Sequence, residues 1–157
     1  MIVNLTQHIS TEQQREAGVE DLSREERAKL ERLLTVPEDE LTSSPETFED
    51  LMAGRVAGVV ALLWPRLAEA DADRVRASAR LYNEGETIAA WNAARKPLFQ
   101  AMVGGAPYLM SKLVARLKEV GVEPIYATSA RRSEESTLPD GSVKKTQVFV
   151  HLGFRPA

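Results

Sequence analysis

The sequence has no cysteine, which excludes a disulfide framework and any metal site that uses thiolate ligands. It has only two histidines, and no spacing of His, Asp and Glu is typical of a metal site, so we expect no metal and no cofactor. Long hydrophobic runs are also missing, because the longest, Val56–Trp64, is far short of the ~20 residues that a membrane span needs. The first residues lack the basic and apolar regions of a signal peptide. We therefore expect a cytoplasmic protein with no membrane partner.

Basic residues are too few for a general nucleic-acid-binding protein, since the net charge is −3. The charge is unevenly spread. Residues 1–97 contain 12 basic and 18 acidic residues, whereas residues 98–157 contain 8 basic and 5 acidic residues. A small anionic ligand would favour the C-terminal part. Ordinary variation of surface charge is the alternative explanation.

The stretch Leu98–Ser129 predicts a strand, a turn, a helix and a second strand. An apolar run of strand length is stopped by Gly104-Gly105, and Pro107 suits the first turn of a helix. Gly121 suits the helix C-cap, and Val122–Thr128 is the second strand. Such a βαβ unit predicts a parallel sheet. The helix between the strands is indicated by apolar residues three or four positions apart, namely Leu109, Leu113, Leu117 and Val120.

The N-terminal residues predict a similar arrangement. Met1–Leu5 is typical of a strand, Thr11–Ala17 of a short helix, and Val19–Leu22 of a second short strand. Ser23-Arg-Glu-Glu26 matches a capping box and predicts a helix that runs to about Leu34.

The middle of the chain predicts a helical insertion at about residues 37–97. We expect one helix to begin at Pro45, the apolar run that follows to end at Pro65, and a further helix from Asp71 to about Ala94, bent or split at Gly85. Large aromatic side chains are mostly buried, so we expect them in the core rather than at an interface. The residues of this region expected to be buried are Trp64, Val75, Ala79, Tyr82, Ile88, Trp91 and Phe99.

The C-terminal residues predict one antiparallel strand. Thr146–Phe154 alternates apolar and polar residues and can fold back on Val122–Ser129. The polar stretch 130–145, with a turn at Asp140-Gly141, is expected to be a long loop. The predicted fold class is therefore a single α/β domain over residues 1–157, with a Rossmann-like, mainly parallel sheet, helices and a C-terminal antiparallel strand.

Three polar clusters follow predicted parallel strands, at the carboxyl ends where ligands of such sheets bind. Gly104-Gly105 allows a ligand to approach the backbone at a helix N-terminus, which favours phosphate, although a tight turn is the alternative. Thr128-Ser129 offers hydroxyls and Arg131-Arg132 offers guanidinium groups, although a solvated loop is the alternative. Thr6-Gln7-His8 adds an imidazole that could act as an acid or base.

Catalytic signals are weaker than binding signals. No carboxylate pair is typical of a hydrolytic site, and no nucleophile elbow surrounds Ser129. A structural role is the alternative for His8 and for His151. The sequence therefore favours a binding site over an active site.

Several of these segments resemble one known family. Pro124-Ile-Tyr-Ala-Thr-Ser-Ala-Arg131, Glu134-Glu135, Asp140-Gly-Ser-Val143 and Val148-Phe-Val-His-Leu-Gly-Phe154 are similar to the C-terminal part of the small standalone CRISPR-associated Rossmann-fold proteins, the CARF-like group. The strand that ends in Thr6-Gln7-His8 and the turn Gly104-Gly105 to Tyr108-Leu109 are also similar to that group. The middle of the chain, residues 36–97, has no counterpart in the resemblance.

The resemblance implies binding of a cyclic oligoadenylate second messenger, usually in a pocket formed across a homodimer, and in some members cleavage by a metal-independent ring nuclease. It implies a ligand-binding set of Thr6, Gln7, His8, Gly104, Gly105, Tyr108, Thr128, Ser129, Arg131 and Arg132. The candidate catalytic residues are Ser129, Arg131 and His8, and no residue is identified as a base.

Two alternatives stay open from the sequence. The chain could sequester a nucleotide signal without cleaving it, as a phage-encoded antagonist would. It could instead be an interaction module without a ligand, with the helical middle and residues Trp64, Trp91 and Phe99 as its contact surface.

Overall fold

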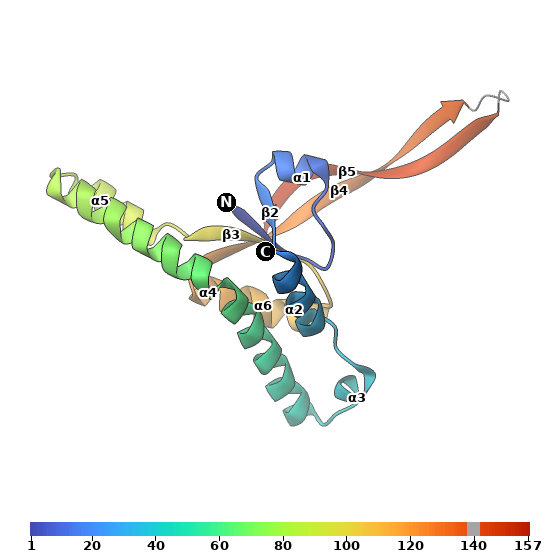
Figure 1. The fold of residues 1–157 in the computed structure, drawn as a ribbon, viewed down its shortest axis with the longest axis horizontal. Coiled ribbons are helices and arrows are strands. Elements are labelled where there is room, and N and C mark those ends of the chain that lie inside the picture. The colour runs from blue at the N-terminus through green and yellow to red at the C-terminus, as the bar shows by residue number, and fades with distance from the viewer. Residues whose placement is uncertain (138–141) are drawn as a thin grey trace.

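The computed structural model describes residues 1–137 and 142–157, which form five strands and six helices (Figure 1). The predicted turn at Asp140-Gly141 lies outside the described residues. In chain order the elements are β1 (Ile2–Leu5), α1 (Glu12–Glu16), β2 (Val19–Asp21), α2 (Arg24–Leu34), α3 (Glu38–Leu41), α4 (Pro45–Asn83), α5 (Thr87–Arg95), β3 (Phe99–Val103), α6 (Pro107–Glu119), β4 (Val122–Thr137) and β5 (Val143–Pro156).

The five strands form one sheet in the order β2-β1-β3-β4-β5. The pairs β1–β2, β1–β3 and β3–β4 are parallel, and β4–β5 is antiparallel. The chain thus passes from β1 to one neighbour through α1 and reaches the other neighbour, β3, only after the helical insertion. This arrangement confirms the predicted fold class, a Rossmann-like α/β sheet with an antiparallel C-terminal strand.

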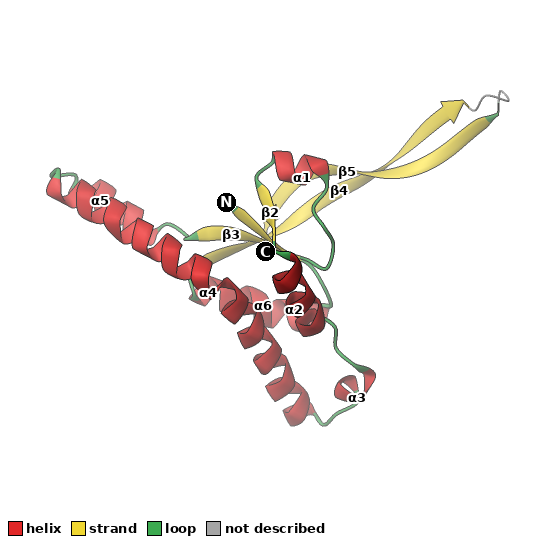
Figure 2. Ribbon diagram, in the orientation of Figure 1, coloured by secondary structure: helices red, strands yellow, loops and turns green. Residues whose placement is uncertain are grey.

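Most of the core lies on one face of the sheet, where α2, α4 and α6 pack together (Figure 2). Val3 and Leu5 of β1 point to this face, and Leu109 and Leu113 of α6 pack onto it. The capping box predicted at Ser23 is present, and Pro107 begins α6 as expected. A second capping box, which we did not predict, begins α1 at Thr11. The second face carries a smaller cluster, formed by Ile2, Val19, Met102 and Ile125.

The stretch 130–145 is not the long loop that we predicted. It is mostly a two-stranded ribbon, because β4 continues to Thr137 and β5 begins at Val143, and the ribbon extends well beyond the rest of the sheet (Figure 1). Its pairing runs without a break from Ser129↔His151 to Thr137↔Val143. Ladder hydrogen bonds between the two strands satisfy the polar backbone there, so no apolar face is needed to specify a strand.

The long helix α4 departs from the prediction at Pro65, which lies inside the helix instead of ending it. Proline removes one helical hydrogen bond at a cost of about 3 kcal/mol. Val59 and Leu63 before it and Leu67 after it are all buried on the core side, and this burial outweighs the loss. Pro65 itself faces solvent. The predicted break at Gly85 is confirmed, since α4 ends at Asn83 and α5 begins at Thr87.

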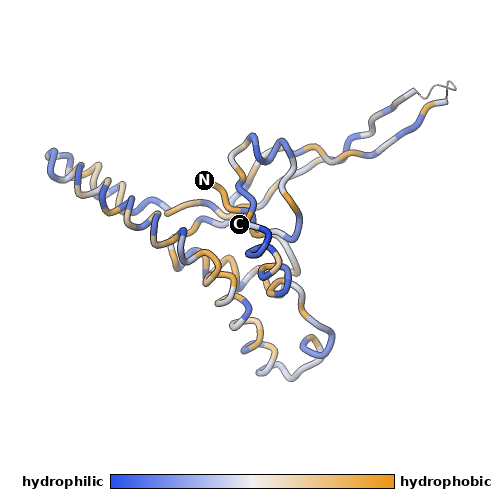
Figure 3. The backbone as a smooth tube through the Cα atoms, viewed as in Figure 1, coloured by the Kyte–Doolittle hydropathy of each residue, from blue (hydrophilic) through white to orange (hydrophobic). Residues whose placement is uncertain are grey.

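The prediction of buried aromatic residues in the insertion was wrong, although Phe99 is buried as expected. The second half of α4 extends beyond the sheet, where α5 packs along one side of it and its other sides stay exposed (Figure 3). Of the described helices, only α4 is long and apolar enough to cross a membrane by length and composition, a test that the core helix of a soluble protein also passes. The residues that were expected to be buried but are exposed are Trp64, Val75, Ala79, Tyr82, Ile88 and Trp91.

Candidate functional site

A hollow of about 460 Å³ lies at the carboxyl ends of β1 and β3. These two strands are neighbours from which the chain leaves in opposite directions, and ligands of open α/β sheets bind at such a switch point. Two of the three predicted clusters, Thr6-Gln7-His8 and Gly104-Gly105, line this one hollow. The other lining residues are Ile9, Thr11, Gln14, Met102, Val103, Tyr126 and Ala127.

The fully buried side chain of Asn4 holds the loop that carries Thr6 and His8. Asn4 Nδ2 donates to the backbone oxygen of His8 at 2.8 Å. Asn4 Oδ1 accepts from the backbone N–H of Thr6 at 2.9 Å and from its hydroxyl at 2.8 Å. Because a buried amide needs its donors and acceptors satisfied, these bonds fix the loop conformation.

Asp21 completes this support from β2, directly opposite Asn4 in the sheet. Its carboxylate accepts from Asn4 Nδ2 at 2.6 Å and from the Ser10 hydroxyl at 2.8 Å, and it forms an ion pair with Arg27 at 2.8 Å. Burial raises the pKa of Asp21, but the hydrogen bonds from Asn4 and Ser10 and the charge of Arg27 lower it further, so the pKa is below its usual value. The group that anchors the loop is therefore ionised at neutral pH.

The side chains of the loop itself reach the open side of the hollow. Gln7 and His8 are exposed, and Thr6 is half-buried. Gln7 Nε2 lies 3.4 Å from the Thr35 hydroxyl beyond the end of α2. The three residues thus offer a hydroxyl, an amide and an imidazole to a bound molecule.

Gly104 and Gly105 form the opposite wall. A Cβ atom at Gly104 would lie 3.4 Å from Thr6 Cγ2, and one at Gly105 would lie 3.1 Å from Met110 Cε. The two predicted clusters therefore lie next to each other, close enough that a side chain at Gly104 would contact Thr6. The wall leads into α6, whose N-cap residue, Ala106, provides no side-chain hydrogen bond to the helix. Pro107 has no N–H, and the Leu109 N–H donates to the Ala106 oxygen at 3.0 Å, so the backbone that lines the hollow on this side is that of Gly104 and Gly105.

The third predicted cluster is not brought to the hollow within one chain. The Thr128 hydroxyl donates to the backbone oxygen of Gly153 at 2.8 Å. Ser129, Arg131 and Arg132 are exposed and follow the ribbon away from Ala127. At roughly 3.3 Å per residue, Arg131 is about 13 Å further along β4 than Ala127.

Comparison with known protein families relates nearly the whole chain to one family. The model of the uncharacterized protein MJ1673 family matches residues 1–155. The chain belongs to the MJ1673 family. No curated protein and no solved structure matches it. The match covers β1 to β4 and all of β5 except its last residue. The hollow at the carboxyl ends of β1 and β3 and the β4–β5 ribbon therefore lie within it.

Tyr108 of the MJ1673-family chain packs away from the predicted cluster. Its ring lies edge-on to Phe48 of α4, with centroids 5.8 Å apart, and it is not among the residues that line the hollow. Tyr126 of β4, which we did not predict, lines the hollow instead, together with Thr11 and Gln14 at the start of α1. Asn4 is the one polar residue in the otherwise apolar strand Met1–Leu5, and this exception could have identified it as a residue that supports the site.

His151 has an unusual environment on β5. Both ring nitrogens are buried and have no hydrogen-bond partner among the residues that the structure describes, while the ring lies 4.6 Å from that of Phe154. The backbone N–H of His151 donates to Gln13 Oε1 of α1 at 3.1 Å, which ties this strand to the helix beside the hollow. Among the described residues of the MJ1673-family protein, no group of three His, Cys, Asp or Glu side chains could hold a metal ion.

Proposed function

We propose that this MJ1673-family protein binds a small anionic nucleotide in the hollow between β1 and β3. The observation that carries the proposal is the convergence of Thr6-Gln7-His8 and Gly104-Gly105 on one hollow at the switch point of the sheet. Its volume, about 460 Å³, falls in the range of roughly 300–1,000 Å³ that small-molecule sites occupy.

The chemistry of the lining supports a nucleotide as the ligand, because each part of one would find a partner there. The backbone at Gly104-Gly105, just before α6, would hold a phosphate. The hydroxyls of Thr6 and Thr11 would bond to ribose, and the side-chain amide of Gln14 would bond to the edge of a base. The ring of Tyr126, which is 39% exposed, offers a surface on which a base can stack.

The lining also limits the charge of the ligand. It contains no Lys or Arg, and His8 is its one basic side chain. A phosphodiester carries one negative charge per phosphate and fits such a lining better than a terminal triphosphate does. A cyclic oligoadenylate, the ligand implied by the CARF-like resemblance, is therefore the first ligand to test, and a linear dinucleotide is the second.

Binding is tested by thermal unfolding and titration calorimetry with cyclic and linear oligoadenylates. A ligand at 100 times its Kd should stabilise the protein by about 2.7 kcal/mol. Gly104→Ala is the informative variant, because its Cβ makes only an ordinary contact with Thr6 yet occupies the hollow. Gly54→Ala, on an open face of α4, is the matched control. Unaltered affinity in Gly104→Ala, or no stabilisation by any nucleotide, would contradict the proposal.

Chromatography of the same mixtures separates cleavage from sequestration. His8 is the one candidate catalytic residue in the lining, whereas Ser129 and Arg131 lie outside it. Linear products that disappear in His8→Ala, with binding retained, would indicate a ring nuclease. Tight binding with an intact ligand would indicate a protein that sequesters the signal.

A further inference from the structure

The second half of α4 and the whole of α5 form an antiparallel helical arm that projects past the edge of the sheet (Figure 1). The last buried residue of α4 is Leu67, and α5 has a single buried residue, Ala90. Helices in proteins are stabilised chiefly by packing of an apolar face. The arm in one chain lacks such packing over most of its length.

The arm nevertheless has an apolar face. A hollow of about 570 Å³ lies between α4 and α5, and it carries none of the predicted site residues. Val75 and Tyr82 of α4 and Trp91 of α5 line it and are 58%, 66% and 58% exposed. Ile88, at the start of α5, is 78% exposed. Large exposed apolar side chains grouped in this way mark an interaction surface.

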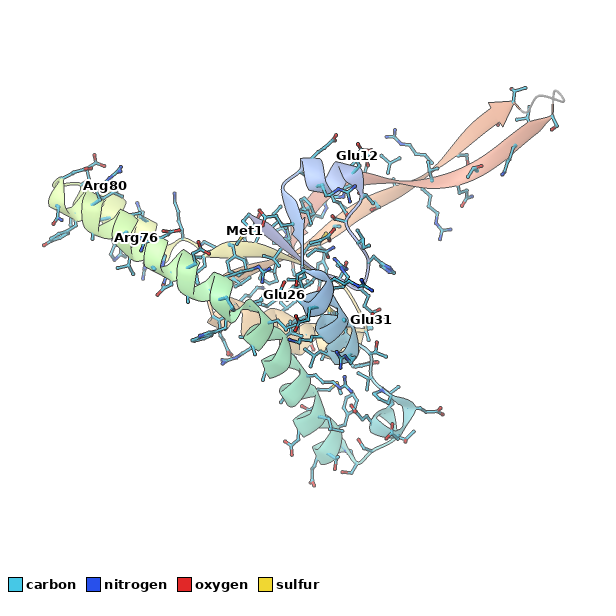
Figure 4. All side chains as sticks on the ribbon, viewed as in Figure 1. Met1, Glu12, Glu26, Glu31, Arg76 and Arg80 are labelled. Carbon is cyan, nitrogen blue, oxygen red and sulfur yellow. The ribbon has the colours of Figure 1, made fainter. Side chains whose placement is uncertain are left out.

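The two ends of the arm have opposite charge. Glu84 and Glu86 lie at the tip, in the turn between the helices, and both are exposed. Arg95 and Lys96 lie at the root, where they border a hollow of about 270 Å³. The three arginines of the arm already have ion-pair partners: Arg74 pairs with Asp71 and Arg76 with Asp73 on α4, and Arg80 forms an exposed pair with Glu84 at the tip. Figure 4 shows Arg76 and Arg80 on the arm.

We propose that the arm is the dimerisation element and that its occupant is the arm of a second copy, packed antiparallel around a two-fold axis. This arrangement exchanges tip and root, so Glu84 and Glu86 of each copy meet Arg95 and Lys96 of the other. The nine residues of α5 span about 13 Å, so one two-fold axis near its middle pairs both ends at once. The product is a four-helix bundle that buries Tyr82 and Trp91 of both copies.

The size of the surface suits a dimer. An aromatic side chain buries roughly 150–250 Å² when fully enclosed. Because Tyr82 and Trp91 are 66% and 58% exposed in one chain, the four aromatic rings of two arms can bury about 350–650 Å² more. Val75, Ile88 and the helix backbones bring the total toward the roughly 1,200–2,000 Å² of a stable interface. This inference does not depend on the nucleotide site, which lies at the other end of β3.

A lipid surface is the competing occupant, because the arm exposes large apolar side chains. The charge pattern favours the second copy. Arg74, Arg76 and Arg80 and their paired carboxylates lie within the arm, and transfer of these charged groups into a lipid interior is costly.

Sedimentation velocity of the full chain over a dilution series tests the proposal. We expect a reversible dimer whose Kd rises at least about tenfold in Trp91→Gln and changes little in Trp64→Gln. Trp64 is the matched control, because it is 65% exposed on α4 but does not line the hollow of the arm. Circular dichroism checks that each variant is folded.

Charge reversal distinguishes the proposed ion pairs between the two copies from non-specific association of apolar surfaces. Glu84→Lys with Glu86→Lys should weaken the dimer, and adding Arg95→Glu and Lys96→Glu should restore it. A monomer at all concentrations, a dimer unaffected by Trp91→Gln, or reversal without rescue would overturn the proposal. Flotation of the protein with phosphatidylcholine vesicles, lost in Trp91→Gln, would overturn it in favour of a lipid surface.

Discussion

Glu26 links two helices of the core, and it provides a sharp test of the packing between α2 and α4. Its carboxylate accepts from Arg66 of α4 at 2.6 and 3.1 Å and from the backbone N–H of Ser23 at 2.9 Å (Figure 4 labels Glu26). The hydrogen bonds from Arg66 lower the pKa of Glu26 most, burial opposes them, and Ser23 adds to them. The resulting pKa is about 2, compared with an ordinary value of 4.5.

The size of the effect follows from the difference between these two pKa values. A shift of roughly 2.5 units corresponds to about 3.4 kcal/mol at 1.36 kcal/mol per unit. The side chains of Arg66 and Glu26 are 28% and 25% exposed, so solvent screening reduces the expected contribution to about 1–2 kcal/mol. Because the folded state has the lower pKa, this contribution is complete above pH 4.5 and is lost as the pH falls toward 2.

Urea denaturation of wild type and Glu26→Gln at pH 7 and pH 3 measures this contribution. Glutamine keeps the capping box but removes the charge, so we expect Glu26→Gln to be about 1–2 kcal/mol less stable at pH 7. The difference in unfolding free energy between wild type and Glu26→Gln should be smaller at pH 3. Glu25→Gln is the control, because Glu25 is exposed and contacts only Lys29 on the same helix. A gap that stays constant between the two pH values would refute the assigned ion pair.

Two further predictions concern the packing. Gly54→Ala should stabilise the protein by about 1 kcal/mol, since a helical Cβ there meets nothing within 4 Å, whereas Gly58→Ala should lose that gain because its Cβ would lie 2.7 Å from Leu33 Cδ2. Equal unfolding free energies for the two variants in urea would contradict this account. His151→Phe should raise stability by about 1 kcal/mol, because it removes two buried nitrogens that lack partners. A lower denaturation midpoint would show that the imidazole has a partner in solution.

The sequence predicted the elements whose apolar period and end signals agree. Pro107, the apolar positions of α6 and Gly121 all specify one helix, and α6 is found over Pro107–Glu119. The same agreement holds for the capping box at Ser23. Both predicted clusters at the ends of β1 and β3 lie in the hollow, because parallel strands end at one edge of a sheet and these two are neighbours.

The third cluster could not be placed because the β4 strand of the ribbon has no apolar alternation. Residues 131–137 are all polar, so no apolar face specifies a strand there, and the pattern resembled a loop. The extent of β4 is set by its pairing with β5 and not by local sequence. Tertiary packing also explains why the helix continues through Pro65, because α4 residues before and after the proline are buried in the core.

Asn4 and Asp21 show how the fold and the candidate site depend on each other. They are register partners on β1 and β2, 17 residues apart, and their hydrogen bond exists only when the two strands pair in parallel. The same amide of Asn4 bonds to Thr6 and His8, so pairing of the sheet also sets the loop that lines the hollow. A loop held in this way needs little further ordering when a ligand binds. Burial of an asparagine side chain costs free energy unless its polar atoms are hydrogen-bonded. At this position those hydrogen bonds hold the loop.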